Sequence, residues 1–213
     1  MARKEFDLSG FIAVEARNAM KVEIARGDIY SVAVEAEAEI IDEVKVEVFG
    51  DKLKAKFETR WGHLGLLLKQ TPSPRLIVTM PEIKSIELVA ATRGSITGFT
   101  GIDRFQAELA GASKLNGNIQ CRELKLEGGA ASHFELSGSA ATAVIDLSAA
   151  SNANLENLTV GDATAKLVGA ASLTLNITGK LDADISGASN LRWLGTPTIG
   201  DLKITGASSF SRK

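Results

Sequence analysis

Hydrophobic and charged residues alternate in short segments, and one such segment returns about every nineteen residues through the C-terminal two-thirds of the chain. Each is a triplet in which a charged residue stands between two apolar ones. The triplets occupy residues 86–88, 107–109, 124–126, 145–147, 165–167, 183–185 and 202–204. Alternation with a period of two is typical of a β-strand that has one face in a core and the other in water. The pattern therefore predicts a series of short strands and no helix in the repeated region.

A box of small residues ending in serine follows each triplet. The copies are Gly111-Ala112-Ser113, Ala130-Ala131-Ser132, Ala149-Ala150-Ser151, Ala170-Ala171-Ser172, Gly187-Ala188-Ser189 and Gly206-Ala207-Ser208. Their serines are 19, 19, 21, 17 and 19 residues apart, and Ala90-Ala91-Thr92 looks like a degenerate first copy. A second alternating segment follows the box, as in residues 134–136 and 173–177. Each repeat is therefore predicted to be strand, small corner, strand and turn.

A unit of this length is too short to enclose its own core, but it is long enough for one circuit of a coil that stacks about 4.8 Å from the next. Glycine and alanine at the corner let successive backbones approach closely. Serines would form a hydrogen-bonded column, and Leu, Ile and Val columns would form the core. The sequence thus predicts an all-β fold, a parallel β-helix (solenoid) of about seven coils. The alternatives fit less well. The sequence does not contain the Leu-x-x-Leu-x-Leu frame of a leucine-rich repeat. A sandwich of hairpins would need many two-residue turn signals, and Asn116-Gly117 is one possible case.

Residues 1–80 lack the box but are rich in strand patterns. These cover residues 11–15, 21–24, 31–37, 44–48, 53–57 and 75–80, with a turn signal at 49–52. A bare end coil would expose unpaired strand edges and apolar columns, so we expect this region to cap the solenoid. The chain is then divided into an N-terminal β cap, residues 1–80, and a parallel β-helix, residues 81–213, which form one continuous structural unit.

The strand pattern stops between the last two of these strands, in an apolar segment. Its large side chains are Trp61, Leu64, Leu66, Leu67 and Leu68. The functional interpretation is a protruding loop that contacts a partner or a second copy of the chain. The structural interpretation is a loop folded back over the core.

Charge and cysteine content exclude several classes of function. The net charge of −2, from 24 basic and 26 acidic residues, gives no clustered basic surface for nucleic acid. A single cysteine, Cys121, excludes an internal disulfide and a multi-cysteine metal site. No stretch approaches the roughly 18 apolar residues of a membrane span, and the start lacks the apolar run of a signal peptide. We expect no nucleic-acid partner and no transmembrane segment.

Candidate chemistry is sparse. Parallel β-helices often carry polysaccharide lyases or hydrolases, which need converging carboxylates. The acids of the coils are scattered among solvent-facing positions: Asp146, Asp162, Asp182, Asp184 and Asp201. Asp182 and Asp184 share one face of a strand, but the further oxygen ligands of a Ca²⁺ site are not identifiable.

The two histidines, His63 and His133, have no neighbouring cysteine, so zinc is not indicated. Ser132 beside His133 is adjacency in sequence and not a nucleophile geometry. We predict no catalytic residues, no metal and no cofactor.

Several segments together resemble one family. They are the Gly-Ala-Ser box with Asp184-Ile185-Ser186-Gly187-Ala188-Ser189 and the residues around it (181–197), the terminal residues 204–209, the opening residues 11–14 and 22–28, and the residues 76–81 before the coil. They are similar to the family described as putative auto-transporter adhesin, head GIN domain, a domain of unknown function. The resemblance covers nearly the whole chain. It implies a right-handed β-helix in bacterial proteins that are commonly exported or lipid-anchored, with a role in adhesion and no catalytic residues.

The sequence favours a non-enzymatic binding or structural module, adhesin-like at the bacterial cell surface or envelope, with an unidentified protein or glycan as its partner. One alternative is a carbohydrate-active enzyme of the β-helix type, a polysaccharide lyase or hydrolase, in which at least two acids converge in a groove. The other is a self-assembling scaffold, a homo-oligomer formed through the apolar loop or an exposed coil end.

Overall fold

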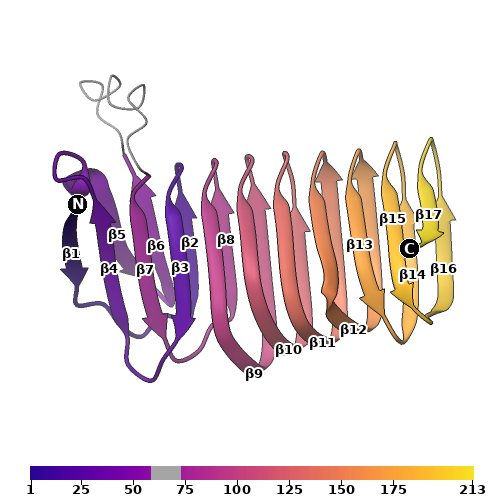
Figure 1. The fold of residues 1–213 in the computed structure, drawn as a ribbon, viewed down its shortest axis with the longest axis horizontal. Coiled ribbons are helices and arrows are strands. Elements are labelled where there is room, and N and C mark those ends of the chain that lie inside the picture. The colour runs from indigo at the N-terminus through magenta and orange to yellow at the C-terminus, as the bar shows by residue number, and fades with distance from the viewer. Residues whose placement is uncertain (59–72) are drawn as a thin grey trace.

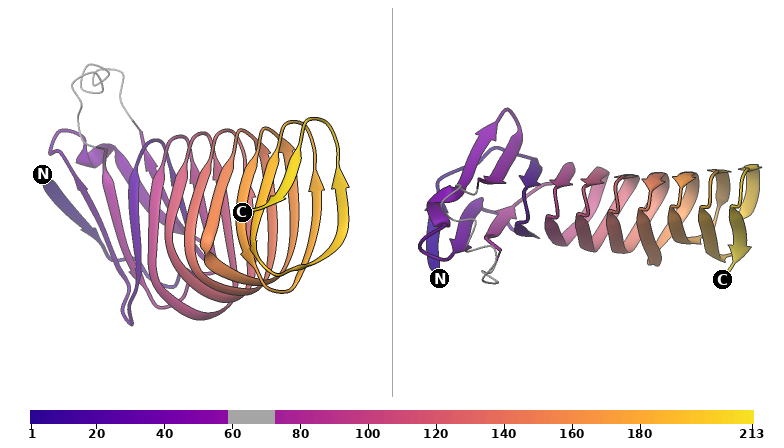
Figure 2. Two further views of the ribbon diagram at one scale, coloured as in Figure 1. Left: turned by 45° about the vertical axis from the view of Figure 1, so that its right-hand side comes forward. Right: turned by 90° about the horizontal axis from the view of Figure 1, so that it is seen from above.

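The computed structural model describes residues 1–58 and 73–213. It is a β-solenoid of about seven turns, so the predicted fold class is confirmed. The coils stack along the long axis of the molecule from the N-terminal to the C-terminal end (Figure 1). Seen from above, the stack is narrow and regular, and it widens at the N-terminal end (Figure 2).

Each coil contributes one strand segment to each of two facing sheets. The first halves of four long strands, β9 (Arg93–Ala110), β10 (Lys114–Gly128), β11 (His133–Ala149) and β12 (Asn152–Gly169), lie in sheet 1, and their second halves lie in sheet 2. Sheet 1 continues with β13 (Ser172–Ile177), β15 (Asn190–Gly195) and β17 (Ser209–Arg212). Sheet 2 continues with β14 (Lys180–Ile185) and β16 (Thr198–Ile204). All these neighbours pair in parallel, as Lys114 with His133 and then Asn152.

The bend opposite the serine corner is continuous strand in four coils, where the sequence predicted a separate turn. Glycines at this bend let neighbouring backbones touch. Gly117 has φ +146°, and a Cβ there would lie 2.0 Å from the carbonyl oxygen of Ile96. Gly138 has φ +116°, and its Cβ would lie 2.1 Å from the oxygen of Ile119. The chain therefore curves from sheet 1 into sheet 2 without leaving the hydrogen-bonded ladder.

The small boxes are tight turns, and in five of the six the first residue has positive φ; in the box that begins at Ala170 the preceding Gly169 takes this conformation. Gly111 (+64°), Ala130 (+51°) and Ala149 (+57°) are examples, and the alanines accept a conformation that suits glycine better. Serine closes the turn: the Oγ of Ser113 donates a hydrogen bond to the oxygen of Ala110 at 2.7 Å. The corner thus combines a strained backbone turn with one side-chain hydrogen bond that stabilises it.

The predicted serine column exists. Ser113, Ser132 and Ser151 are each 1% exposed, and the Oγ of Ser132 donates to the Oγ of Ser151 at 3.2 Å. Thr92 takes the same place one coil earlier, where its backbone N–H donates to Ser113 Oγ at 3.3 Å. The degenerate first copy is therefore a true corner, and these coils lie directly on one another.

Ser172 departs from the column, although its box fits the sequence pattern. It pairs with Asn152 on the outer face of sheet 1, and Ala171, which is 1% exposed, takes the buried position. The N–H of Ala171 donates to the Oγ of Ser189 at 3.2 Å. The coil before Ala171 is one residue longer than nineteen and the coil after it one shorter, which accounts for the serine spacings of 21 and 17.

Inward-facing apolar side chains, most of them aliphatic, form the core between the sheets. One column on sheet 2 is Ala107, Leu126, Ile145, Ala165 and Ala183, all 5% exposed or less. On sheet 1, Leu115, Phe134 and Leu173 are fully buried in another column. Because each layer covers the next, small and medium aliphatic residues suffice for burial.

Two strands of the N-terminal region form one more layer at the N-terminal end of the stacked coils. The strands β2 (Ala13–Arg17) and β3 (Lys21–Arg26) pair in parallel with β8 (Ser85–Val89) and with β9. Between β2 and β3, Asn18 and Ala19 have positive φ and donate their N–H groups to the corner at Val89 and Ala90. This corner has no serine box, so the sequence did not predict it.

The outermost N-terminal strands form the predicted β cap. Beyond β2 and β3 lie β6 (Lys52–Phe57) and β7 (Arg75–Met80), also parallel to them. Antiparallel strands cover these: β5 (Val44–Phe49) on β6, β4 (Ser31–Ala36) on β7, and β1 (Ala2–Phe6) on β4. A 3₁₀ turn, η1 (Ile41–Glu43), precedes β5. In the part of the chain that the structure describes, no helix is long and apolar enough to cross a membrane.

Candidate interaction faces

Two of the carboxylates considered for catalysis, Asp182 and Asp184, lie in surface ion pairs. Asp182 Oδ2 lies 2.9 Å from Lys180 Nζ, and its Oδ1 accepts the backbone N–H of Asp201 at 2.7 Å. These contacts, led by the lysine, hold the pKa of Asp182 below its usual value. Asp184 lies 3.7 Å from Lys203. A general acid in glycoside cleavage requires a raised pKa, and the pKa of Asp182 is shifted in the opposite direction.

His133 and Ser132 point to opposite sides of the chain. Ser132 is buried in the serine column, and His133 is half-buried on the outer face of sheet 1. Burial, and then the charge of Lys114, lower the pKa of His133. Burial also raises the pKa of the Cys121 thiol to about 11, so the thiolate that a nucleophile needs is suppressed. The second histidine, His63, lies outside the described residues.

Sheet 2 carries a column of stacked carboxylates on its outer face. They are Glu15, Glu87, Glu108, Glu127 and Asp146, on five adjacent strands. Arg17 bridges Glu15 and Glu87, each at 2.6 Å. Within residues 1–58 and 73–213, no three His, Cys, Asp or Glu side chains are arranged to hold a metal ion. The column is therefore a charged surface in which stacking places like charges about 4.8 Å apart.

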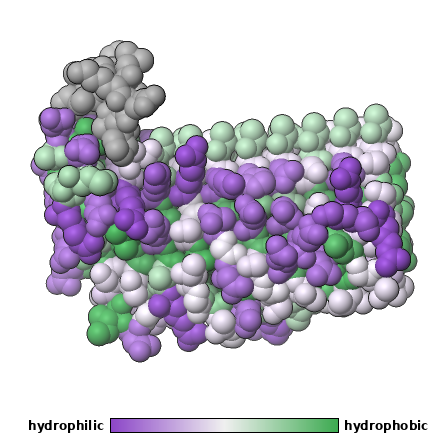
Figure 3. Space-filling view, viewed as in Figure 1, coloured by the Kyte–Doolittle hydropathy of each residue, from purple (hydrophilic) through white to green (hydrophobic). Residues whose placement is uncertain are grey.

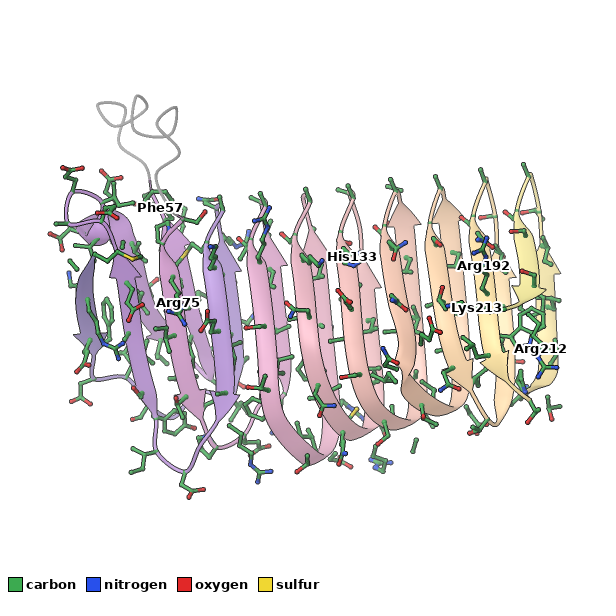
Figure 4. The ribbon with its side chains drawn as sticks, in the orientation of Figure 1. Phe57, Arg75, His133, Arg192, Arg212 and Lys213 are labelled. Carbon is green, nitrogen blue, oxygen red and sulfur yellow. The ribbon has the colours of Figure 1, made fainter. Side chains whose placement is uncertain are left out.

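The N-terminal half of sheet 1 carries the opposite charge. Its outermost column near the corner runs through Arg75, Lys21, Arg93, Lys114 and His133. Acids of the next column pair with some of these: Arg75 Nε donates to Glu23 at 2.7 Å. Arg75, His133 and Arg192 lie along this sheet, with Arg212 and Lys213 at the C-terminal end (Figure 4).

In the C-terminal half of sheet 1, amides and hydroxyls take the positions of this basic column, and Arg192 pairs with Thr174 in the next column. We call this group the amide–hydroxyl patch: Asn152, Asn154, Ser172, Thr174, Asn176 and Asn190. Asn152 is exposed, and the others are half-buried on the outer face of β12, β13 and β15. In this described part of sheet 1, the side chains of Asn152 and Thr174 make no hydrogen bond to another described residue, so their polar groups are free for a ligand.

The corners form a ridge of exposed alanines along one edge of the molecule. The second residue of each turn is alanine, and the members are Ala91, Ala112, Ala131, Ala150, Ala170, Ala188 and Ala207. Figure 3 shows them as a pale row above the more polar surface. Methyl groups alone supply no hydrogen bond or charge, so the ridge separates the two sheet faces chemically.

The predicted interaction loop lies outside the described residues. This applies to Trp61, Leu64, Leu66, Leu67 and Leu68. The amide–hydroxyl patch was missed in the sequence because its members lie on three different coils. Aligning the repeats on their corners would have shown Asn152, Ser172 and Asn190 at equivalent positions, once the slip at Ala171 was known.

The family model described as putative auto-transporter adhesin, head GIN domain, matches residues 10–197. Among curated proteins, none matches the chain.

Solved structures match the whole chain in fold. A putative adhesin from Bacteroides fragilis has 17% identity and a TM-score of 0.87, with 100% of this chain and 96% of that chain covered. A putative lipid binding protein from Parabacteroides distasonis has 16% identity and a TM-score of 0.73, with the same coverage. A putative adhesin from Parabacteroides merdae has 12% identity and a TM-score of 0.70, with 100% and 95% covered. Identities this low establish the shared fold alone.

Proposed function

The chain belongs to the putative auto-transporter adhesin, head GIN domain family, and from this premise we propose that it is a non-enzymatic, adhesin-like binding module of the bacterial cell envelope. Its ligand is an uncharged glycan, bound along the amide–hydroxyl patch of sheet 1. The family description supports adhesion, and the patch supports the chemical class of the ligand.

The observation that carries the proposal is the change in chemistry along sheet 1. A basic column in the N-terminal half becomes Asn152, Ser172 and Asn190 in the C-terminal half. Amides and hydroxyls both donate and accept hydrogen bonds, as sugar hydroxyls do, and they avoid the cost of desolvating a charge. The strands hold these groups rigidly, so little side-chain and backbone freedom is lost on binding.

The patch repeats with the coil. Asn152 and Asn154 lie on one strand, and Ser172 and Thr174 lie beside them on the next. A ladder with a step of about 4.8 Å suits an extended polymer that meets the same groups at each layer. We propose the N-terminal region, residues 1–80, as the cap that keeps this ladder in register, and the loop that carries Trp61 as a second contact.

The enzyme alternative needs two converging acids with different pKa values. The nearest carboxylates to the patch, Glu135 and Glu156, face other partners: Glu135 lies 3.7 Å from Lys114, and Glu156 pairs with Lys213. Carbohydrate binding without cleavage fits these contacts better.

The lipid-binding name of the Parabacteroides distasonis neighbour suggests a second ligand class. In this chain the space between the sheets is filled, with Leu115, Phe134 and Leu173 at 0% exposure. A lipid would therefore have to bind on the outer surface, and the patch offers it no apolar contact.

Binding to an array of neutral polysaccharides, with acidic polysaccharides for comparison, tests the proposal. We expect binding to neutral chains, and we expect the double variant Asn152→Ala, Thr174→Ala to weaken it. Two lost hydrogen bonds of about 0.5–1.5 kcal/mol each correspond to a roughly 5- to 150-fold loss.

The matched control is Gln106→Ala, Thr164→Ala, which removes one amide and one hydroxyl from sheet 2. Its affinity should equal that of the wild type. Binding to no neutral glycan, equal loss in both variants, or shortening of the polysaccharide during incubation would each contradict the proposal.

A further inference from the structure

The C-terminal end of the solenoid leaves two strands with a free edge. Among the described strands, β16 pairs only with β14, and β17 pairs only with β15. The N–H of Thr205 donates to the oxygen of Ile185 at 2.9 Å, toward β14. Since successive residues of a strand direct their backbone groups to opposite sides, those of Leu202 and Ile204 point to the open side. Such an edge is a template for another strand.

The core is also open beneath this edge. Ile199, Leu202 and Ile204 are 39%, 41% and 42% exposed, although they continue the inward columns of sheet 2. The residues they stack on, Leu181, Ala183 and Ile185, are 5% exposed or less. The apolar columns therefore end in solvent at β16, where one more layer would bury them.

Sheet 1 ends differently. Phe210 on β17 stacks on Trp193 with ring centroids 4.1 Å apart, which closes this side of the core. The strand ends at the charged residue Arg212, and Lys213 follows it. The open surface is thus centred on β16.

We propose that β16 pairs antiparallel with β16 of a second copy of this chain, across a two-fold axis at Leu202. The strand is complementary to itself in charge. With Leu202 opposite Leu202, Asp201 of one copy lies opposite Lys203 of the other, twice in the interface. Both side chains are exposed on the outer face of sheet 2, and cross-strand pairs of opposite charge stabilise such a ladder.

The two-fold axis is perpendicular to sheet 2, so sheet 2 continues from one copy into the other. The outer faces of the two copies of sheet 1 then lie on the same side of the dimer. The dimer buries Leu202 and Ile204 and satisfies their free backbone groups. It also places two amide–hydroxyl patches on one surface, where a long ligand can engage both. The pairing does not depend on the glycan proposal, because it rests on the free edge and the open core.

The test is the mass of the full chain measured by light scattering over a range of concentrations. We expect a dimer, twice the 22.5 kDa of the chain, that dissociates on dilution. Leu202→Lys should weaken the dimer at least tenfold, and Val144→Lys, at a side chain 50% exposed on the outer face of sheet 2, should leave it unchanged. A monomer at every concentration, or a Leu202→Lys variant that still forms the dimer, would overturn the proposal.

Charge reversal tests the register. Asp201→Lys and Lys203→Asp each create two like-charge contacts and should weaken the dimer, and the double variant restores both ion pairs. A double variant as weak as the single ones would contradict the register.

Cross-linking tests the position of the axis. Cα atoms in a hydrogen-bonded antiparallel pair are about 5.5 Å apart, within the range of a disulfide. Leu202→Cys should give a covalent dimer under mild oxidation, and Val144→Cys should not. The native Cys121 does not interfere, because its thiol is buried and its pKa is raised to about 11. No cross-link at position 202 would exclude an axis there.

Discussion

Replacing Gly138 by alanine should destabilise the solenoid more than almost any other single methyl addition. The residue has φ +116°, and the added Cβ would lie 2.1 Å from the carbonyl oxygen of Ile119 in the neighbouring coil. A non-glycine residue in such a conformation costs about 1–3 kcal/mol. The oxygen belongs to backbone and cannot rotate away, so the two coils must separate locally.

Separation adds to that cost. The ladder at the bend loses hydrogen bonds worth about 0.5–1.5 kcal/mol each, which brings the expected destabilisation to about 3–5 kcal/mol. The unfolding free energy of a domain of ordinary stability is about 5–15 kcal/mol, so a loss of this size is large and measurable. The assay is urea unfolding monitored by circular dichroism. The slope of the unfolding free energy against urea concentration is compared between variants, because repeat proteins can lose cooperativity.

Gly129→Ala is the matched control. A Cβ at Gly129 would meet only the Oγ of Ser148, at 3.5 Å, which is an ordinary contact. We expect no loss of stability, or a gain of about 0.4–1 kcal/mol from reduced freedom of the unfolded chain. Equal stability of the two variants would refute the close backbone packing at the bend.

Three further predictions follow from buried groups. Ser151→Ala removes the 2.6 Å hydrogen bond from its Oγ to the oxygen of Ser148 and should lower the unfolding free energy in urea by about 1–3 kcal/mol; an unchanged value would show that the corner does not need it. Cys121 should react with iodoacetamide at pH 8 far more slowly in the folded than in the unfolded protein, and equal rates would show that it is not buried. The pKa of His133 is lowered in the folded state, mainly by burial and then by Lys114, so the unfolded chain binds a proton first as the pH falls through 6.5. The unfolding free energy should therefore decrease below that pH, and His133→Asn should remove part of this slope; an identical slope would contradict the lowered pKa.

The coil could be predicted from the sequence because stacking imposes the same requirement on every layer. A corner with positive φ needs small residues, and a buried position needs apolar ones, so both return with each circuit. Ser113, Ser132 and Ser151 were assigned correctly for this reason. Ser172 was assigned wrongly to the column, because compensating changes in the lengths of two coils leave the local motif intact and shift only the register.

Other features depend on pairings that spacing does not encode. The layer formed by β2 and β3 turns at Asn18 and Ala19, which share no serine box with the later corners. Its position between β6 and β8 results from the N-terminal strands joining the stack out of sequence order. The amide–hydroxyl patch likewise emerges only when Asn152 and Ser172 are known to be neighbours.

The central claim is that successive coils pair in register, and one cross-linking measurement tests it most directly. Glu135 pairs with Asn154 on the next coil, and Thr174 lies one coil further. Adjacent parallel strands are about 4.8 Å apart, so cysteines at 135 and 154 are within disulfide range. Strands two coils apart are separated by twice that distance, so cysteines at 135 and 174 are too far apart. Mass spectrometry after mild oxidation should find an internal disulfide in Glu135→Cys, Asn154→Cys and none in Glu135→Cys, Thr174→Cys. Free thiols in the first variant, or equal yields in both, would contradict the stacked register.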